Sequence, residues 1–154
     1  MALLKKGDQA PMIKGKDQNG NIITNESLKG KKIILYFYPK DMTPGCTDEA
    51  CNLRDNYQTL IRKGFVIIGV SADNELSHQK FIAKHSLPFP LIADTDKQII
   101  MAFGAWGEKS MYGKKYEGII RSTFVINEKG IIEEVFAKVE TKRHTEQILE
   151  TLKQ

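Results

Sequence analysis

The sequence has few cysteines and no long apolar segment. Cys46 and Cys51 are the only cysteines among its 154 residues. No stretch approaches the roughly 20 apolar residues that a membrane-spanning helix needs. The apolar run that follows Met1 is shorter than the core of a signal peptide, which takes about 7–15 residues. We therefore expect a cytoplasmic location, where cysteines are kept reduced. Two cysteines in that compartment indicate chemistry rather than a structural disulfide.

The sequence also lacks any block of like charge. The formal net charge is +4, but the lysines are spread along the chain, and no aromatic and basic motif of an RNA-binding type occurs. A solvated surface of mixed charge is expected, with neither nucleic acid nor a membrane as partner. With 41% hydrophobic and 27% charged residues, the chain has the composition of a globular protein, and we predict a single domain over residues 1–154.

Two continuous apolar runs, at residues 33–38 and 65–70, are typical of strands buried on both faces of a parallel sheet. A helix is predicted between them over about 44–62. The other expected elements are a small hairpin across 17–20, a helical turn at 27–30, a helix over 75–85, a short strand after 87–92, a short helix near 97–103, a loop-rich stretch with Gly104, Gly107 and Gly113, a hairpin of 122–126 with 131–136, and a last helix over about 142–152. This order predicts an α/β, thioredoxin-like fold, in which helices flank a mixed central sheet and an N-terminal β-hairpin is an extension.

The loop that follows the first buried run contains the residues with chemical potential. Ligands bind at this edge of open α/β sheets. Cys46 falls in the first turn of the next helix, where free N–H groups and the helix dipole favour an anion such as a thiolate. Thr43 has a hydroxyl that can donate to this thiolate or hold a ligand oxygen. Pro39 shapes the loop wall, Pro44 presets the turn into the helix, and Gly45 lets the backbone come close to a small ligand.

A helix terminus is too weak by itself to keep a thiol ionised. A thiol of ordinary pKa is only about 3% thiolate at pH 7, and making it mostly thiolate takes about 2.7 kcal/mol. A helix N-terminus supplies at most about 2 kcal/mol in a partly buried site. We therefore expect a cation close to Cys46.

These residues resemble a known family. Pro39, Thr43 and Cys46 match the Pro-x-x-x-Thr-x-x-Cys signature of peroxiredoxins, and the string 43–47 with Cys51 is similar to the bacterioferritin comigratory protein, or peroxiredoxin Q, group. The resemblance extends over nearly the whole chain. It implies a thiol-specific, thioredoxin-dependent peroxidase without a cofactor, often monomeric, that reduces hydrogen peroxide and organic hydroperoxides in antioxidant defence and redox homeostasis. It also implies that Arg121 is the missing cation, whose forked donors stabilise the transition state.

The resemblance further implies how Cys46 is recycled. Cys46 becomes a sulfenic acid, Cys51 resolves it as an intramolecular disulfide, and thioredoxin or a similar dithiol protein reduces that disulfide. Residues five apart in an intact helix have Cα atoms about 8.6 Å apart, whereas a disulfide needs them within about 7 Å. We therefore expect oxidation to unwind the start of the helix. Inert packing of Cys51 stays an alternative, because the family has members without a resolving cysteine at this place.

The sequence leaves the roles of Glu49, Trp106 and the three histidines open. Glu49 either joins the hydrogen-bond network of the site and relays a proton, or only compensates the helix dipole. Trp106 is expected to pack rather than to line the site mouth. His78 and His85 are predicted on a helix surface, apart from His144, and no metal site is expected because the cysteine spacing does not match zinc ligands.

Two further functions are compatible with a reactive cysteine. One is a redox-regulated binding protein or holdase that uses Cys46 as a sensor. The other is a thioredoxin-like disulfide exchanger, which the absence of a Cys-x-x-Cys motif disfavours.

Overall fold

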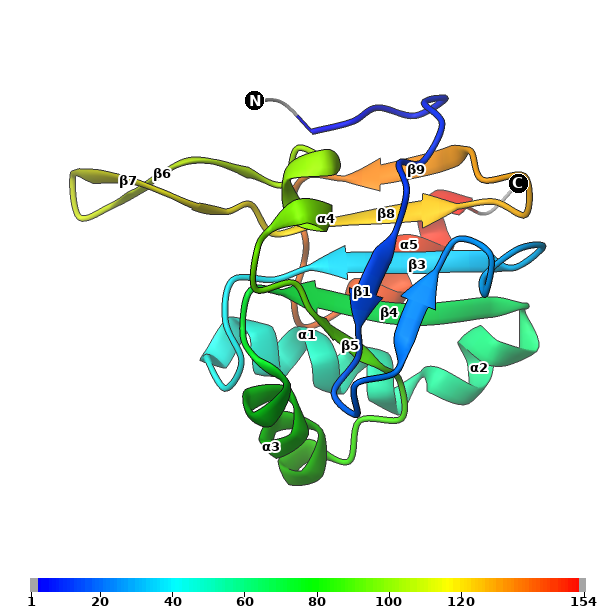
Figure 1. Ribbon diagram of the computed structural model, residues 1–154, viewed down its shortest axis with the longest axis horizontal. Coiled ribbons are helices and arrows are strands. Elements are labelled where there is room, and N and C mark those ends of the chain that lie inside the picture. Colours follow the sequence, from blue (N-terminus) through cyan, green and yellow to red (C-terminus); the bar gives the residue numbers. More distant parts are fainter. Residues whose placement is uncertain (1–2, 153–154) are drawn as a thin grey trace.

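The computed structural model describes residues 3–152 and centres on a five-stranded sheet in the order β5-β4-β3-β8-β9 (Figure 1). Its strands are β3 (Lys32–Phe37), β4 (Phe65–Ser71), β5 (Leu91–Ala93), β8 (Ser122–Ile126) and β9 (Ile132–Phe136). Strands β3, β4 and β5 are mutually parallel, whereas β8 pairs antiparallel with β3 and β9. The predicted mixed central sheet is therefore confirmed.

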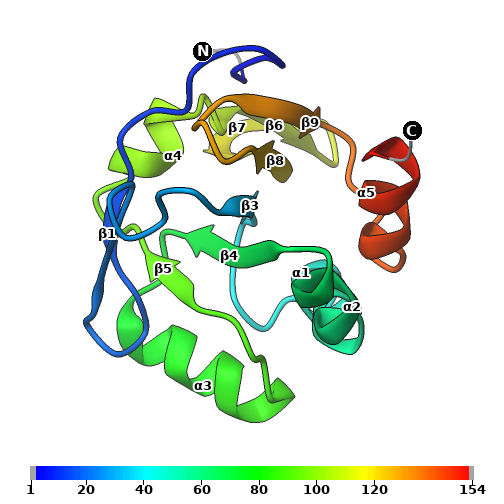
Figure 2. The same cartoon turned by 90° about the vertical axis from the view of Figure 1, so that its right-hand side faces the viewer.

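Helices cover both faces of this sheet (Figure 2). They are α1 (Pro44–Asp55), α2 (Tyr57–Arg62), α3 (Glu75–His85), α4 (Gln98–Ala102) and α5 (His144–Leu152). Helices α1, α2, α3 and α5 lie on one face, and α4 lies on the other beside the N-terminal strands. No helix among residues 3–152 is long and apolar enough to cross a membrane.

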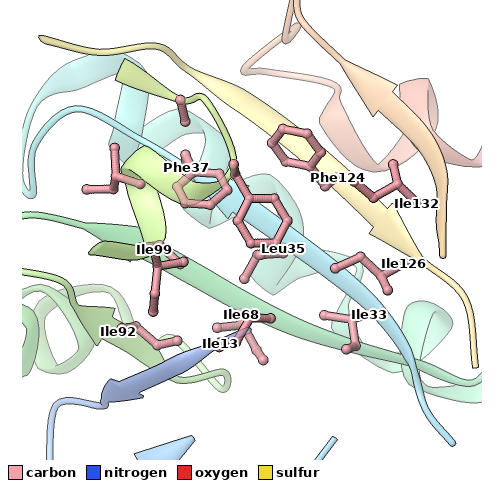
Figure 3. Close-up of a cluster of buried hydrophobic side chains, with 14 of the residues drawn as sticks. Ile13, Ile33, Leu35, Phe37, Ile68, Ile92, Ile99, Phe124, Ile126 and Ile132 are labelled. Atoms are coloured by element: carbon pink, nitrogen blue, oxygen red, sulfur yellow. The ribbon is translucent and has the colours of Figure 1, made fainter. Parts of the chain in front are cut away.

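The side chains of β3 alternate between the two faces of the sheet and so belong to two separate core clusters. Ile33, Leu35 and Phe37 point to the face that α4 and the N-terminal segment cover (Figure 3). Ile34 and Tyr36 point to the opposite face, where α1, α2, α3 and α5 pack. Because successive side chains of a strand alternate between faces, an uninterrupted apolar run is what a strand buried on both sides requires.

The predicted N-terminal hairpin is present as β1 (Lys14–Lys16) and β2 (Ile22–Thr24), which pair antiparallel. Asp17 closes its turn, since one carboxylate oxygen accepts from the backbone N–H groups of Asn19 at 2.9 Å and Asn21 at 3.0 Å. An aspartate that bonds the backbone two residues on is a common way to fix a turn.

One helical prediction needs correction. The helix expected over 44–62 is two helices, divided at Asn56. The side chain of Asn56 donates to the Asn52 carbonyl at 2.8 Å, so it competes with the backbone for a helical acceptor. The short turn expected at 27–30 is present as a hydrogen-bonded turn, in which the Leu28 N–H donates to the Thr24 carbonyl at 3.2 Å, four residues back as in a helix.

The loop-rich prediction near Gly104, Gly107 and Gly113 is wrong for most of that stretch. Strands β6 (Trp106–Met111) and β7 (Lys114–Ile119) form an antiparallel hairpin that projects from the body of the protein (Figure 1). Tyr112 and Gly113 make its two-residue turn with φ of 53° and 79°, the left-handed pair that a tight hairpin needs. Its residues are mostly exposed, so no apolar alternation indicated strands.

Candidate active site

The start of α1 places Cys46 at the edge where β3 ends. Thr43 is the N-cap residue, with an extended backbone, and Pro44 is the first residue of the helix. Cys46 is the third, and only 1% of it is exposed. The first backbone N–H groups of a helix have no partner within it. The sulfur therefore lies in the first turn, where these free N–H groups favour an anion although burial opposes one.

Arg121 reaches this cysteine from the position directly before β8. In the pairing of β3 with β8, Phe37 lies opposite Ser122, so Arg121 stands beside the point where the chain leaves β3. Its Nη2 donates to Cys46 Sγ at 3.4 Å, and its Nη1 donates to Glu49 Oε1 at 2.8 Å. One guanidinium thus bridges a sulfur and a carboxylate, as the forked geometry of arginine allows.

Gly45 makes room for that guanidinium. A Cβ atom at this position would lie 3.1 Å from Arg121 Nη2, which is tighter than ordinary van der Waals contact. We predicted that Gly45 lets the backbone approach a small ligand, but the space beside it contains Arg121. A side chain there would force the guanidinium of Arg121 to shift by a few tenths of an ångström.

Thr43 holds the loop in this structure. Its hydroxyl donates to the Lys40 carbonyl at 2.7 Å rather than to Cys46. The hydroxyl must therefore rotate before it can donate to a thiolate. Pro39 is half-buried in the loop that follows β3, and Pro44 is exposed at the helix start.

Glu49 lies one turn after Cys46 and is fully buried. Burial raises its pKa from 4.5 to about 7, although the charge and hydrogen bond of Arg121 oppose the shift. Its second oxygen, Oε2, has no hydrogen-bond partner among the described residues. The imidazole Nε2 of His144 lies 3.7 Å from that oxygen. Glu49 is therefore part of the site network and more than a compensating charge on a helix surface.

His144 is a neighbour of the site that sequence reasoning missed. It is the first residue of α5 and is fully buried. Burial lowers its pKa from 6.5 to about 4, so its imidazole is neutral near pH 7. No spacing in the sequence connects it with Glu49, because the packing of α5 against α1 brings the two together.

Cys51 lies further along the same helix as Cys46. Both cysteines are free, and Cys51 is half-buried. Its Sγ lies 3.8 Å from Nδ1 of His85 on α3, within reach of a weak sulfur hydrogen bond. The two cysteines therefore sit in one unbroken helix in this state, which is the geometry that the expected unwinding has to change.

Comparison with known proteins identifies the family of this chain. The AhpC/TSA family model matches residues 6–135. The peroxiredoxin Bcp of Bacillus subtilis (strain 168) is 46% identical over 147 residues, which cover 96% of this chain and 94% of that protein. The chain belongs to the peroxiredoxins of the AhpC/TSA family. Peroxiredoxins are thiol-dependent peroxidases, so this chain is an oxidoreductase.

Further relatives place this peroxiredoxin in the bacterioferritin comigratory protein, or peroxiredoxin Q, group. The peroxiredoxin Bcp of Escherichia coli (strain K12) is 43% identical over 151 residues, 98% of this chain and 97% of that protein. Structure F4 of Xanthomonas campestris peroxiredoxin Q has a TM-score of 0.85 and 37% identity, covering 92% of this chain and 89% of that one. The predicted thioredoxin-like fold is confirmed by this similarity.

His78 of the peroxiredoxin is not on the surface, contrary to the prediction. It is fully buried, and its ring nitrogens lie 2.7 Å from Asp41 Oδ2 and 2.9 Å from the Ile92 carbonyl oxygen. Two ring nitrogens that both find acceptors explain how a histidine fits the inner face of α3. Asp41, Asp73 and His78 are the one group of clustered possible metal ligands among residues 3–152, and their hydrogen bonds to one another and to neighbours account for the cluster.

Trp106 packs against the core cluster on the α4 face of the sheet, as expected. Its indole N–H donates to Glu117 across the β6–β7 hairpin at 3.1 Å. The ammonium group of Lys97 lies 5.4 Å from the centre of its ring, within the range of a cation–π interaction. These contacts give Trp106 a structural role at the base of the hairpin.

The buried carboxyl of Glu49 should make the stability of the peroxiredoxin depend on pH. A folded-state pKa near 7, against 4.5 when unfolded, means that the folded state holds the proton more tightly. The stabilising contribution is full below pH 4.5 and is lost as the pH rises through 7, by roughly 3 kcal/mol. Urea unfolding of the reduced protein and of Glu49→Gln should therefore be compared at pH 4.5 and 8.5, and the difference in stability between the two should change by this amount. The opposite effect of His144, whose lowered pKa weakens the fold at acid pH, is common to both proteins and cancels in the difference. Parallel pH profiles for the two proteins would contradict the prediction.

Proposed function

We propose that this peroxiredoxin reduces hydrogen peroxide and organic hydroperoxides through Cys46, in the antioxidant defence and redox homeostasis of the cytoplasm. One observation carries the proposal: Arg121 Nη2 donates to the buried sulfur of Cys46 at 3.4 Å, in the first turn of α1. A guanidinium and a helix N-terminus together favour the thiolate, which is the reactive form. The enzyme acts as a monomer and without a cofactor.

The substrate class has support from a relative. A Xanthomonas campestris bacterioferritin comigratory protein, with a TM-score of 0.85 and 36% identity over 92% of this chain, is described by its alkyl peroxide reduction activity. The first step is the same for hydrogen peroxide and for alkyl hydroperoxides. The thiolate attacks the terminal peroxide oxygen, an S–O bond forms, the O–O bond breaks, and the leaving oxygen takes up a proton. The forked donors of Arg121 stabilise the charge that moves from sulfur to oxygen, and Thr43 holds the peroxide oxygen after its hydroxyl leaves the Lys40 carbonyl.

The second half of the cycle uses Cys51. Its thiol attacks the sulfur of the Cys46 sulfenic acid, the disulfide forms, and water leaves. The expected reductant is thioredoxin or a similar dithiol protein, which needs access to an exposed disulfide. Cys51 is half-buried and the two cysteines share α1, so unwinding of the start of α1 both permits the bond and exposes it.

Turnover with a complete reducing system tests the function. Thioredoxin, thioredoxin reductase and NADPH are mixed with the protein, and NADPH consumption is measured as peroxide is added. An enzyme consumes NADPH in step with peroxide over many equivalents per protein. Oxidation of Cys46 once per chain, with no further NADPH consumption, would favour the redox sensor instead. A parallel reaction without the protein gives the uncatalysed rate.

A further inference from the structure

Arg121 faces two acidic groups at once. Its guanidinium contacts Cys46 Sγ on one side and Glu49 Oε1 on the other, and these residues are 1% and 0% exposed. Two anions beside one cation in a buried site leave one negative charge uncompensated, which costs free energy in a medium of low dielectric constant. The site is therefore neutral only when one of the two groups carries a proton.

The hydrogen bonds of His144 fix which of its nitrogens is an acceptor. The amide of Gln147 donates to the Lys138 carbonyl at 2.7 Å, so its oxygen faces His144 Nδ1 at 2.9 Å. Nδ1 must then carry the hydrogen and Nε2 must be the acceptor. Nε2 accepts from the Thr123 hydroxyl at 2.7 Å.

His144 Nε2, which carries no hydrogen and whose lone pair accepts from Thr123, lies 3.7 Å from Glu49 Oε2. This oxygen is buried and has no hydrogen-bond partner within the described part of the chain. Because burial also disfavours a charged His144, this imidazole gives Oε2 neither a hydrogen nor a positive charge. A negative charge on this side of Glu49 is therefore unstabilised, and the protonated carboxyl is favoured.

The remaining charged and titratable groups leave this conclusion unchanged. Arg121 is the one arginine or lysine within ion-pair distance of Glu49 among residues 3–152. Tyr36 approaches from β3, and burial raises its pKa well above 10, so its hydroxyl stays neutral. Lys109 approaches from β6 with a pKa lowered by burial and by Arg121, and its ammonium donates to the Ile119 carbonyl at 2.9 Å.

We propose that Glu49 is the proton reservoir of the site: it is a carboxylic acid while Cys46 is a thiolate, and a carboxylate once Cys46 is a sulfenic acid. The inference rests on the proposed function of Cys46. In the balanced step, the thiolate, the hydroperoxide and the acid form of Glu49 become the sulfenic acid, the alcohol and the carboxylate. Two electrons pass from sulfur to the peroxide, an S–O bond forms and the O–O bond breaks. The proton that Glu49 releases balances the proton that the leaving oxygen takes up.

Glu49 acts in this scheme as a positioning residue, since it touches Arg121 and not the peroxide. One negative charge lies beside Arg121 throughout the step, first on Cys46 and afterwards on Glu49. The buried site therefore never has to accommodate an unpaired guanidinium or two competing anions. A fixed total charge in a dry site avoids the cost of reorganising its surroundings.

Proton uptake during the first oxidation tests the reservoir. The Cys51→Ser variant stops at the sulfenic acid, and one equivalent of hydrogen peroxide is added at pH 7 in weak buffer with a pH indicator. We expect uptake near zero in this parent and about one proton per Cys46 when Glu49→Gln is added, because the amide has no proton to release. Glu128→Gln, in the exposed turn before β9, is the matched control and should behave as the parent does.

Equal proton uptake with and without Glu49→Gln, while peroxide is still consumed, would overturn the reservoir and leave the proposed function standing. No consumption of peroxide by the parent would overturn both. Infrared difference spectra of the parent give a check that needs no Glu49 variant. Oxidation should remove a protonated-carboxyl band, and an unchanged band would refute the proposal.

Discussion

The Cys46→Ser variant is expected to reduce no peroxide above the rate of buffer alone. A serine hydroxyl stays protonated at neutral pH and is a weak nucleophile without an adjacent base, even beside the guanidinium of Arg121. The ion pair of Arg121 with Glu49 at 2.8 Å does not involve the sulfur, so the fold should survive. Peroxide consumption in the presence of dithiothreitol measures the loss, and circular dichroism checks the fold.

Dithiothreitol reduces peroxide slowly by itself, so a reaction without the protein gives the baseline, and exposed methionines are a second, protein-borne source of peroxide consumption. Met111 is 56% exposed on the projecting hairpin, far along the chain from α1. The Met111→Leu variant should therefore consume peroxide as the unmodified protein does. Residual catalytic consumption by Cys46→Ser would remove Cys46 from the centre of the mechanism.

The Cys51→Ser variant should lose thioredoxin-dependent turnover completely while keeping the first oxidation. Without Cys51, the sulfenic acid of Cys46 has no partner within the chain and advances to the sulfinic acid when peroxide is in excess. Thioredoxin and its reductase should then consume no NADPH above the rate without the protein, although one equivalent of peroxide per chain oxidises Cys46. A small dithiol such as dithiothreitol should restore turnover, because it can enter the site and attack the sulfenic acid directly. Full turnover with thioredoxin would remove the role we assign to Cys51.

The same variant separates unwinding from oxidation. In the unmodified protein, the disulfide should abolish hydrogen-exchange protection in the first turns of α1, because an intact helix holds the Cα atoms of Cys46 and Cys51 about 8.6 Å apart. In Cys51→Ser, one equivalent of peroxide should leave that protection in place. A disulfide-bonded protein with α1 protected as in the reduced form would show that the bond forms without unwinding.

The sequence alone was sufficient for the central sheet and for the position of Cys46, the proposed nucleophile, at the start of a helix. Residues 33–38 and 65–70 are continuously apolar, which is the pattern typical of strands buried on both faces of a parallel sheet. The start of α1 was equally visible, because Thr43 and Pro44 are local signals for the beginning of a helix. Cys46 could therefore be placed in a helical first turn without any tertiary information.

Local patterns failed where a segment has no buried face or where a side chain interrupts a helix. The β6–β7 hairpin is mostly exposed, so nothing in its sequence alternates, and Tyr112 and Gly113 are a weaker turn signal than Asn-Gly. Asn56 ends α1 through its own side-chain hydrogen bond. His78 was expected in solvent because a histidine is polar, but Asp41 and the Ile92 carbonyl satisfy it inside the protein.

The candidate site is likewise divided between features that local sequence sets and features that tertiary packing sets. Cys46, Thr43 and the helix start are close in the chain, and their arrangement follows from short-range geometry and the residues themselves. Arg121 is 75 residues away from Cys46, and only the pairing of β8 with β3 brings its guanidinium to the sulfur. The packing of α5 on α1 puts a neutral imidazole behind Glu49. The sequence therefore determined which atom we propose to react, the sulfur of Cys46, whereas the tertiary structure decided which charges surround it, because burial and long-range packing set the free energy of a charge.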